Sequence, residues 1–171
     1  MKIMKLNILK FTVSVLITFA TLMIYSCSKD EVVAPLPALK KTVKIGDIFA
    51  GGTVYYVEPN GEHGLMTWSS DLISGGANFA DAFTLCENFQ SSTSGEPNPS
   101  TDWYLPSVAE MQKLYAQKTF IGGFKNDNYW TSTEDPNDTS VAYCVRFANG
   151  AGDATVATRT VKFNVRPIRK F

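Results

Sequence analysis

Few side chains in this sequence are suited to covalent chemistry. Its single histidine, His63, lies in a run of turn-forming residues at positions 58–64. One turn histidine cannot provide the paired spacing of a zinc site, and by itself it cannot build a Ser-His-Asp or Cys-His arrangement. The glycine pairs at 51–52 and 122–123 lack the lysine and the strand-to-helix context of a phosphate-binding loop. The sequence therefore predicts a protein that is not an enzyme and carries no cofactor.

One cluster of oxygen-bearing side chains could bind a hard cation or a polar ligand. It lies between two predicted strands and consists of Glu134, Asp135, Asn137 and Asp138. Calcium prefers carboxylate and amide oxygens, so this loop is the candidate ligand-binding site, with calcium as the possible ion. The alternative is a solvated turn, because Asp, Asn and Pro are also the usual turn residues.

Cys27 stands at the end of a segment typical of export signals. Three lysines, at positions 2, 5 and 10, are followed by an uncharged, mostly apolar run at positions 11–25. At 1.5 Å per residue this run reaches about 22 Å, short of the roughly 30 Å hydrocarbon core of a bilayer. Residues 24–27 resemble a lipobox, although Tyr25 is bulkier than its usual occupant. We expect residues 1–26 to be a lipoprotein signal peptide; the alternative is an ordinary secreted protein.

Cys27 would then be the first residue of the mature chain and would be lipidated on its sulfur, with fatty acids such as palmitate. A lipid anchor contributes about 0.8 kcal/mol per buried methylene, so a multi-chain anchor holds a protein at a membrane. Residues 27–44 read as a lipidated tether, because they contain prolines, valines and lysines without a period. Positions 28–31 resemble an acidic export tag, which predicts an outer membrane lipoprotein exposed at the cell surface or, alternatively, facing the periplasm.

The charge balance excludes nucleic acid as a partner. Removal of the leader takes away three of 16 basic residues and no acid, so the mature chain has 13 basic and 16 acidic residues. A mildly acidic domain without basic–aromatic clusters repels phosphates. The remaining candidate partners are the membrane, through the lipid, and a glycan or protein ligand.

Two further thiols, Cys86 and Cys144, remain after lipidation. An envelope protein lies in an oxidising compartment, which permits a disulfide between them. The bond requires β-carbons within roughly 4.5 Å, a distance that spacing in the sequence does not determine. The alternatives are a disulfide and two buried free thiols.

The elements that must position these residues follow from the pattern of the chain. Residues 53–57 and 65–68 are β-branched and aromatic runs around a turn, which predicts a hairpin. Apolar residues then recur at three- and four-residue steps from Phe79 to Phe89, which predicts a helix capped by Asn78. Ser107 and Glu110 form a capping box at the start of a second helix.

The rest of the chain is patterned as strands. Residues 129–133 form one and residues 141–148 another, in which Val141, Tyr143, Val145 and Phe147 alternate onto one face. Residues 156–169 contain the closing strand or strands. The order predicts an α+β domain, with two helices packed on a mainly antiparallel sheet.

Five motifs in order carry a resemblance to a known family. They are the residues at 102–107 with Glu110 (DWYLPS…E), 129–134 (YWTSTE), 142–147 followed by Asn149 and Gly150, 165–169 (VRPIR), and the opening 45–47 with the glycines at 51, 52 and 64. Together they resemble the Lcl C-terminal domain family, over residues 45–171. Arg166 and Arg169, within the last motif, are arginines of the kind that pair with buried or semi-buried carboxylates.

The resemblance implies a C-type-lectin-like fold, with a twisted sheet, two helices, long loops and chain ends close together. The domain that gives the family its name ends a collagen-like bacterial adhesin that binds glycosaminoglycans. We therefore expect a membrane-anchored envelope lipoprotein with a non-catalytic binding or adhesion module. The alternative is a structural envelope component that binds an assembly partner.

Overall fold

The computed structural model describes residues 42–171 except 50, 92–99 and 149–151. Cys27, the predicted signal peptide and nearly all of the tether lie outside the described residues. Lys41–Phe171 form one compact unit. No helix in the described part of the chain is long and apolar enough to cross a bilayer.

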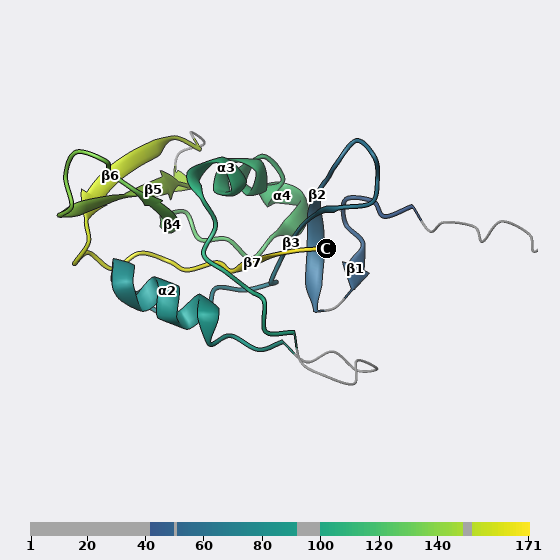
Figure 1. Ribbon diagram of the computed structural model, residues 1–171, viewed down its shortest axis with the longest axis horizontal. Coiled ribbons are helices and arrows are strands. Elements are labelled where there is room, and N and C mark those ends of the chain that lie inside the picture. Colours follow the sequence, from purple (N-terminus) through teal and green to yellow (C-terminus); the bar gives the residue numbers. More distant parts are fainter. Residues whose placement is uncertain (1–41, 50, 92–99, 149–151) are drawn as a thin grey trace, which may run out of the picture. The chain divides into compact units, whose positions relative to one another are not determined.

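The predicted hairpin belongs to a four-stranded antiparallel sheet in the order β1-β2-β3-β7. Its strands are β1 (Ile48–Phe49), β2 (Gly52–Val57), β3 (Gly64–Thr67) and β7 (Ile168–Lys170). The turn between β2 and β3 closes with the Glu58 amide donating to the His63 carbonyl at 2.8 Å. Figure 1 shows that the C-terminal strand returns to lie beside this hairpin.

A second antiparallel sheet has three strands in the order β4-β5-β6. These are β4 (Asn128–Glu134), β5 (Val141–Arg146) and β6 (Ala154–Thr158). The chain between β6 and β7 connects the two sheets and forms a parallel bridge from Asn164 to Tyr129 of β4. The expectation of strands in both the 141–148 and 156–169 regions is confirmed.

Both predicted helices are present with their predicted caps. α2 (Phe79–Glu87) begins after Asn78, whose side chain accepts from the Asp81 amide. α3 (Val108–Ala116) begins after Ser107, and both hydrogen bonds of the capping box with Glu110 are formed. A short third helix, α4 (Lys118–Ile121), follows directly. The sequence pattern did not predict it.

β4 and β5 contribute buried residues to core clusters on both faces of the three-stranded sheet, whereas the residues of β6 are exposed or half-buried. Ala142 and Cys144 of β5 pack in one core cluster with Phe79, Ala82 and Cys86 from α2. The next residue, Val145, packs in a second cluster with Met111 and Leu114 of α3. Val141 and Tyr143 lie on the same face of β5 as Val145, as the alternation predicted. Both are half-buried, because α3 covers only the far end of that face.

The architecture is α+β, as predicted, but the single sheet expected from the sequence is wrong. The strands form two sheets, because β7 pairs with β3 and none of the strands β1, β2, β3 and β7 pairs with β4, β5 or β6. A third core cluster, built on Val54, Met66 and Trp103, lies under the first sheet. Val43 and Phe171, near the two ends of the described domain, both pack against it.

Candidate functional site

The acidic loop predicted as a ligand site is exposed, and its side chains bind within the protein. The Glu134 carboxylate pairs with Arg159 at 2.6 Å. Asp135 Oδ1 accepts from the amides of Asn137 and Asp138 at 2.8 and 3.1 Å. These contacts are typical of a self-stabilised turn.

Asp138 shows the same local use of its oxygens. Its Oδ1 accepts from the Ser140 hydroxyl at 2.6 Å and from the Ser140 amide at 2.8 Å, and these two hydrogen bonds lower the pKa of the carboxyl. Within the described residues no group of three His, Cys, Asp or Glu side chains is placed to hold a metal ion. The loop therefore has the geometry of the solvated-turn alternative.

Cys86 and Cys144 are free thiols in the structure, and both are buried in the same core cluster. Burial, with a smaller effect from Glu87, raises the pKa of the Cys86 thiol to about 12. Burial also raises the pKa of Cys144 to about 11. A thiol that is neutral and enclosed at neutral pH is a poor nucleophile. Of the two alternatives, a disulfide and two buried free thiols, Cys86 and Cys144 match the second.

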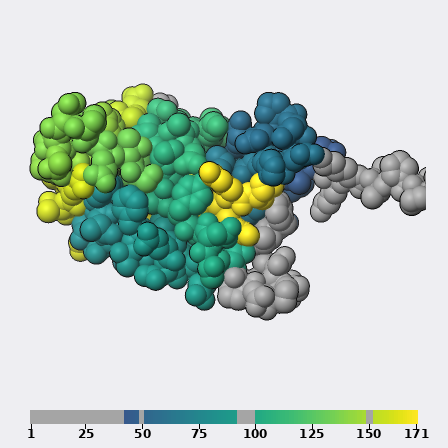
Figure 2. Space-filling view, viewed as in Figure 1, coloured from purple at the N-terminus to yellow at the C-terminus, as the bar shows by residue number. Residues whose placement is uncertain are grey.

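A pocket of about 380 Å³ opens where the hairpin, α3 and the C-terminal strand meet. We call it the hairpin pocket; it is lined by Tyr56, Glu58, His63, Gly64, Leu65, Glu110, Lys113, Lys170 and Phe171. Figure 2 shows the yellow C-terminal residues reaching the surface beside the blue segment that contains the hairpin. The pocket joins residues from positions 56–65, 110–113 and 170–171, which only the tertiary fold brings together.

Glu110 forms a fixed anionic side of the hairpin pocket. Its Oε1 accepts from the Tyr104 hydroxyl at 2.8 Å, and its Oε2 accepts from the Ser107 amide and hydroxyl at 2.9 and 2.7 Å. Burial alone would raise the pKa of Glu110. The hydrogen bonds from Ser107 and Tyr104, together with the charge of Lys170, lower it overall. The carboxylate therefore stays ionised and held in place.

Two lysines supply the opposite charge. Lys113 places its Nζ 3.8 Å from the centroid of the Tyr56 ring, and Lys170 lies 5.9 Å from the centroid of the Tyr104 ring. Both side chains are exposed, and among the described residues neither ammonium has a carboxylate within ion-pair distance. The pocket thus presents two ammonium groups, the carboxylates of Glu58 and Glu110, and aromatic surface to a ligand.

Arg166 and Arg169, expected to pair with carboxylates, do so in different surroundings. Arg166 is fully buried, and its Nη2 lies 2.8 Å from Asp71, a side chain only 7% exposed. Arg169 pairs with Asp102 at 2.5 Å, but that carboxylate is 59% exposed, so the expectation of a buried or semi-buried partner holds only for Arg166.

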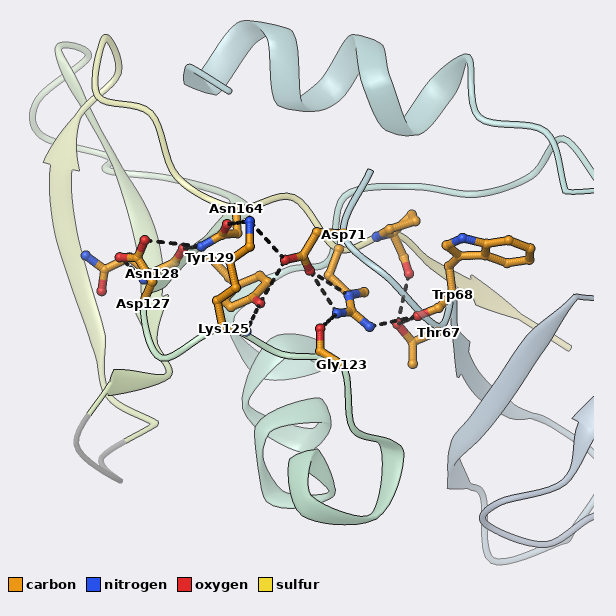
Figure 3. Close-up of polar contacts among 11 residues, drawn as sticks. Thr67, Trp68, Asp71, Gly123, Lys125, Asp127, Asn128, Tyr129 and Asn164 are labelled. Carbon is orange, nitrogen blue, oxygen red and sulfur yellow. Dashed lines mark hydrogen bonds and ion pairs between the residues drawn. The ribbon is translucent and has the colours of Figure 1, made fainter. Parts of the chain in front are cut away.

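Figure 3 shows the polar cluster around Asp71. Tyr129 donates its hydroxyl to Asp71 at 3.2 Å, and the Lys125 ammonium lies 3.8 Å away. Lys125 also donates to Asn164 at 3.1 Å. The cluster ties the β3–α2 connection to β4 and to the C-terminal segment. Its groups are satisfied by one another, which is the pattern of a structural network.

Sequence reasoning missed the hairpin pocket as a site. It singled out His63 in the right turn and Glu110 in the capping box, but it gave neither a role in binding. The sequence did contain one signal for this site: charged residues in the predicted turn and at the predicted helix start, together with an aromatic predicted strand. Nothing in the sequence indicated that Lys170 would meet α3, since that contact depends on the pairing of β7 with β3.

The comparisons with known proteins are consistent with the motifs. No curated protein matches the chain. The family model for the Lcl C-terminal domain matches residues 59–169, which is more than half of the chain. The match contains most of the pocket lining, while Tyr56, Glu58, Lys170 and Phe171 lie outside it. The chain belongs to the Lcl C-terminal domain family.

Proposed function

We propose that this protein is a lipid-anchored envelope protein whose Lcl C-terminal domain is a non-catalytic binding module. The observation that carries the proposal is the hairpin pocket, where Lys113 and Lys170 face a ligand-sized space without an ion-pair partner among the described residues. Ammonium groups beside aromatic rings are suited to hold an anionic ligand. The architecture supports placing this domain among the C-type-lectin-like folds.

The ligand class that fits best is a saccharide carrying carboxylate or sulfate groups. The apolar faces of sugar rings can pack on Tyr56 and Phe171, and the two lysines can pair with the anionic groups. Glu58 and the fixed carboxylate of Glu110 can accept hydrogen bonds from hydroxyl groups. A neutral glycan would leave the two ammonium groups unpaired and would bind more weakly.

Retention on immobilised glycans tests this proposal. We expect the protein to be retained on acidic polysaccharides more strongly than on neutral ones, and salt to weaken the retention because the pairs are exposed. The double variant Lys113→Gln/Lys170→Gln should lose about tenfold or more in affinity. Lys162→Gln is the matched control, since Lys162 is an exposed lysine outside the pocket.

Two further arms of the same experiment separate the alternatives. Chelation of calcium should leave retention unchanged if the hairpin pocket is the site, whereas dependence on calcium would assign the site to the loop of Glu134, Asp135, Asn137 and Asp138. If no glycan is retained and a tight protein partner co-purifies, the protein is a structural envelope component and the glycan proposal fails.

The anchor is tested separately, at Cys27. We expect mass spectrometry to find a mature N-terminus that begins with an acylated Cys27, and a Cys27→Ser variant to leave the membrane fraction. Protease treatment of intact cells should remove the domain if it is exposed at the cell surface. Full protection of the domain would instead place it on the periplasmic side.

A further inference from the structure

The three-stranded sheet has an open edge at β6. One side of Ala154–Thr158 pairs with β5 in a continuous register, and no described residue pairs with the other side. Figure 1 shows β6 at the outside of its sheet. Natural edge strands are usually protected by a charge, a proline or a bulge. β6 contains alanine, threonine and valine only, and so it has none of the side-chain protections.

The hydrogen bonds to β5 determine which backbone groups of β6 point outward. The Arg159 amide donates to the Ser140 carbonyl, and the Arg146 amide donates to the Asp153 carbonyl. Bonding alternates along an antiparallel pair, so Thr155 and Ala157 also bond to β5. The amide and carbonyl groups of Ala154 and Val156 and the amide of Thr158 therefore point away from the sheet, toward a prospective partner. The Thr158 carbonyl already accepts a hydrogen bond from the Val161 amide at 3.0 Å.

This edge is complementary to itself. In an antiparallel pairing centred on Val156, the outward groups of Val156 meet those of Val156 in a second copy. Ala154 of each copy then lies opposite Thr158 of the other copy. Each residue whose backbone amide points outward therefore meets another such residue. The same register places Thr155 opposite Ala157 of the second copy, which puts small and β-branched side chains side by side.

Charges at the two ends of β6 favour the same register. Asp153 and Arg159 lie three residues on either side of Val156, so Asp153 of one copy lies opposite Arg159 of the other. The Asp153 side chain is 62% exposed and lies 3.8 Å from Arg146. Arg159 lies 2.6 Å from Glu134. The pairing would produce a row of alternating charges at each end, while a parallel arrangement would place like charges together.

The outer face of the edge is apolar. Val156 is 45% exposed, and its neighbour across the sheet is Tyr143 of β5, which is half-buried. Pairing about the two-fold axis would place the two Val156 side chains together, with a tyrosine on each side. Removal of this apolar surface from water favours association.

We infer that this protein forms a two-fold symmetric dimer by antiparallel pairing of β6 with β6 of a second copy, centred on Val156. The contact is isologous, so it closes at two subunits and does not propagate. Five paired residues bury less surface than a standard interface, so the isolated dimer is weak. Anchoring both copies in one membrane would raise their effective concentration and populate the dimer. The inference does not depend on the ligand of the hairpin pocket.

A cysteine placed on the symmetry axis tests the register. In the proposed pair the two Val156 Cα atoms would lie about 5.5 Å apart, within the range that a disulfide spans. The full chain carrying Val156→Cys, solubilised in a mild detergent and oxidised, should form a covalent dimer whose linked peptide joins residue 156 to residue 156. The matched control is Val161→Cys, another exposed valine that lies off the axis and should not cross-link.

Sedimentation velocity of the full chain, measured over a wide range of concentrations, tests the energetics. We expect a monomer–dimer equilibrium that Val156→Lys weakens at least about tenfold, because an edge lysine opposes pairing. Asp153→Arg should weaken it as well, whereas Glu87→Arg, the same charge change on an exposed residue of α2, should not. A monomer at all concentrations, or a dimer that Val156→Lys and Asp153→Arg leave unchanged, would overturn the inference.

Discussion

Arg166 is the one charged residue that is completely buried among the described residues. Its guanidinium donates hydrogen bonds to Asp71 through Nε at 2.9 Å, to the Trp68 carbonyl at 3.0 Å and to the Gly123 carbonyl at 2.5 Å. Its guanidinium also lies 4.1 Å from the centroid of the Phe124 ring. One side chain thus holds together three segments that are far apart in the sequence.

Replacement of Arg166 should be among the most damaging single changes in the domain. Arg166→Met leaves the Asp71 carboxylate buried without its main partner, and removal of one member of a buried ion pair costs about 3–5 kcal/mol. Chemical denaturation should show this loss in the free energy of unfolding. Arg146→Met is the control: its pair with Asp153 is exposed, so the change should cost less than about 1 kcal/mol. Equal costs for the two variants would contradict the structural role of Arg166.

The two glycines after the β3 strand allow the effects of backbone conformation and space to be separated. Gly75 and Gly76 both have positive φ, at 86° and 76°. A Cβ at Gly75 would meet nothing within 4 Å, while a Cβ at Gly76 would lie 2.7 Å from the Phe163 carbonyl oxygen. The backbone around Phe163 pairs with Ala77, so it cannot easily move away.

We expect Gly75→Ala to cost only the left-handed conformation, about 1–2 kcal/mol. Gly76→Ala should cost clearly more, because it adds a backbone clash to the same conformational penalty. Thermal unfolding of the two variants side by side measures the difference. If the two melting temperatures fall equally, the clash with the Phe163 carbonyl does not contribute to the loss of stability.

At the scale of the element, local sequence determines where α3 begins, and the tertiary fold then makes this end of the helix part of the hairpin pocket. The capping box of Ser107 and Glu110 determines where the helix begins, and it could be predicted from four residues of sequence. The same carboxylate accepts from Tyr104 and faces Lys170 across the hairpin pocket. The start of the helix and one side of the pocket are therefore the same group.

The lowered pKa of Glu110 makes this element sensitive to acid. A carboxyl whose pKa is lower in the folded than in the unfolded state stabilises the fold above its ordinary value, here 4.5, and this contribution disappears as the pH falls through the folded pKa. The free energy of unfolding should therefore fall in that acidic window. Glu110→Gln should show a shallower fall there, whereas Glu87→Gln, on the exposed side of α2, should follow the unsubstituted protein.

The hairpin, α2, α3, β4 and β5 could be predicted from the sequence, whereas α4 could not. The hairpin, α2 and α3 carry their patterns and caps in contiguous residues. The alternation of Val141, Tyr143, Val145 and Phe147 likewise predicted β5, but it could not show that α2 would cover the opposite face at Cys144. α4 has no side-chain cap, so it left no signal at its start.

At the scale of the molecule, the sequence did not predict sites built from residues that are far apart in the chain. Motif order was sufficient to identify the family, because each motif is local. The hairpin pocket could not be predicted, because Lys170 of β7 comes near Lys113 of α3 only through the pairing of β7 with β3, which no periodicity encodes. The acidic loop drew attention for its composition, yet its oxygens are taken up by neighbours such as Ser140 and Arg159.

The two thiols offer a measure of how cooperatively the whole domain opens. Cys86 and Cys144 are both fully enclosed, and a raised pKa keeps each in its unreactive form at neutral pH. A thiol-specific reagent should therefore modify them only when the domain unfolds. Mass spectrometry of the labelled peptides should show both sites modified with one rate constant. Rapid labelling of one thiol in native conditions would mean that α2 opens by itself.

The chain enters the domain at Val43 and ends its last strand next to Phe171, and both residues pack on the same core cluster. Tension between an incoming anchor and a cargo held at the hairpin pocket would therefore travel through β1, β2, β3 and β7. Lys113 of the pocket lies on α3, and α3 packs on Val145 of β5, so part of the load would also reach the β4–β6 sheet. If the protein is anchored and binds a ligand as proposed, drag on the ligand would load both sheets, and α3 would couple them.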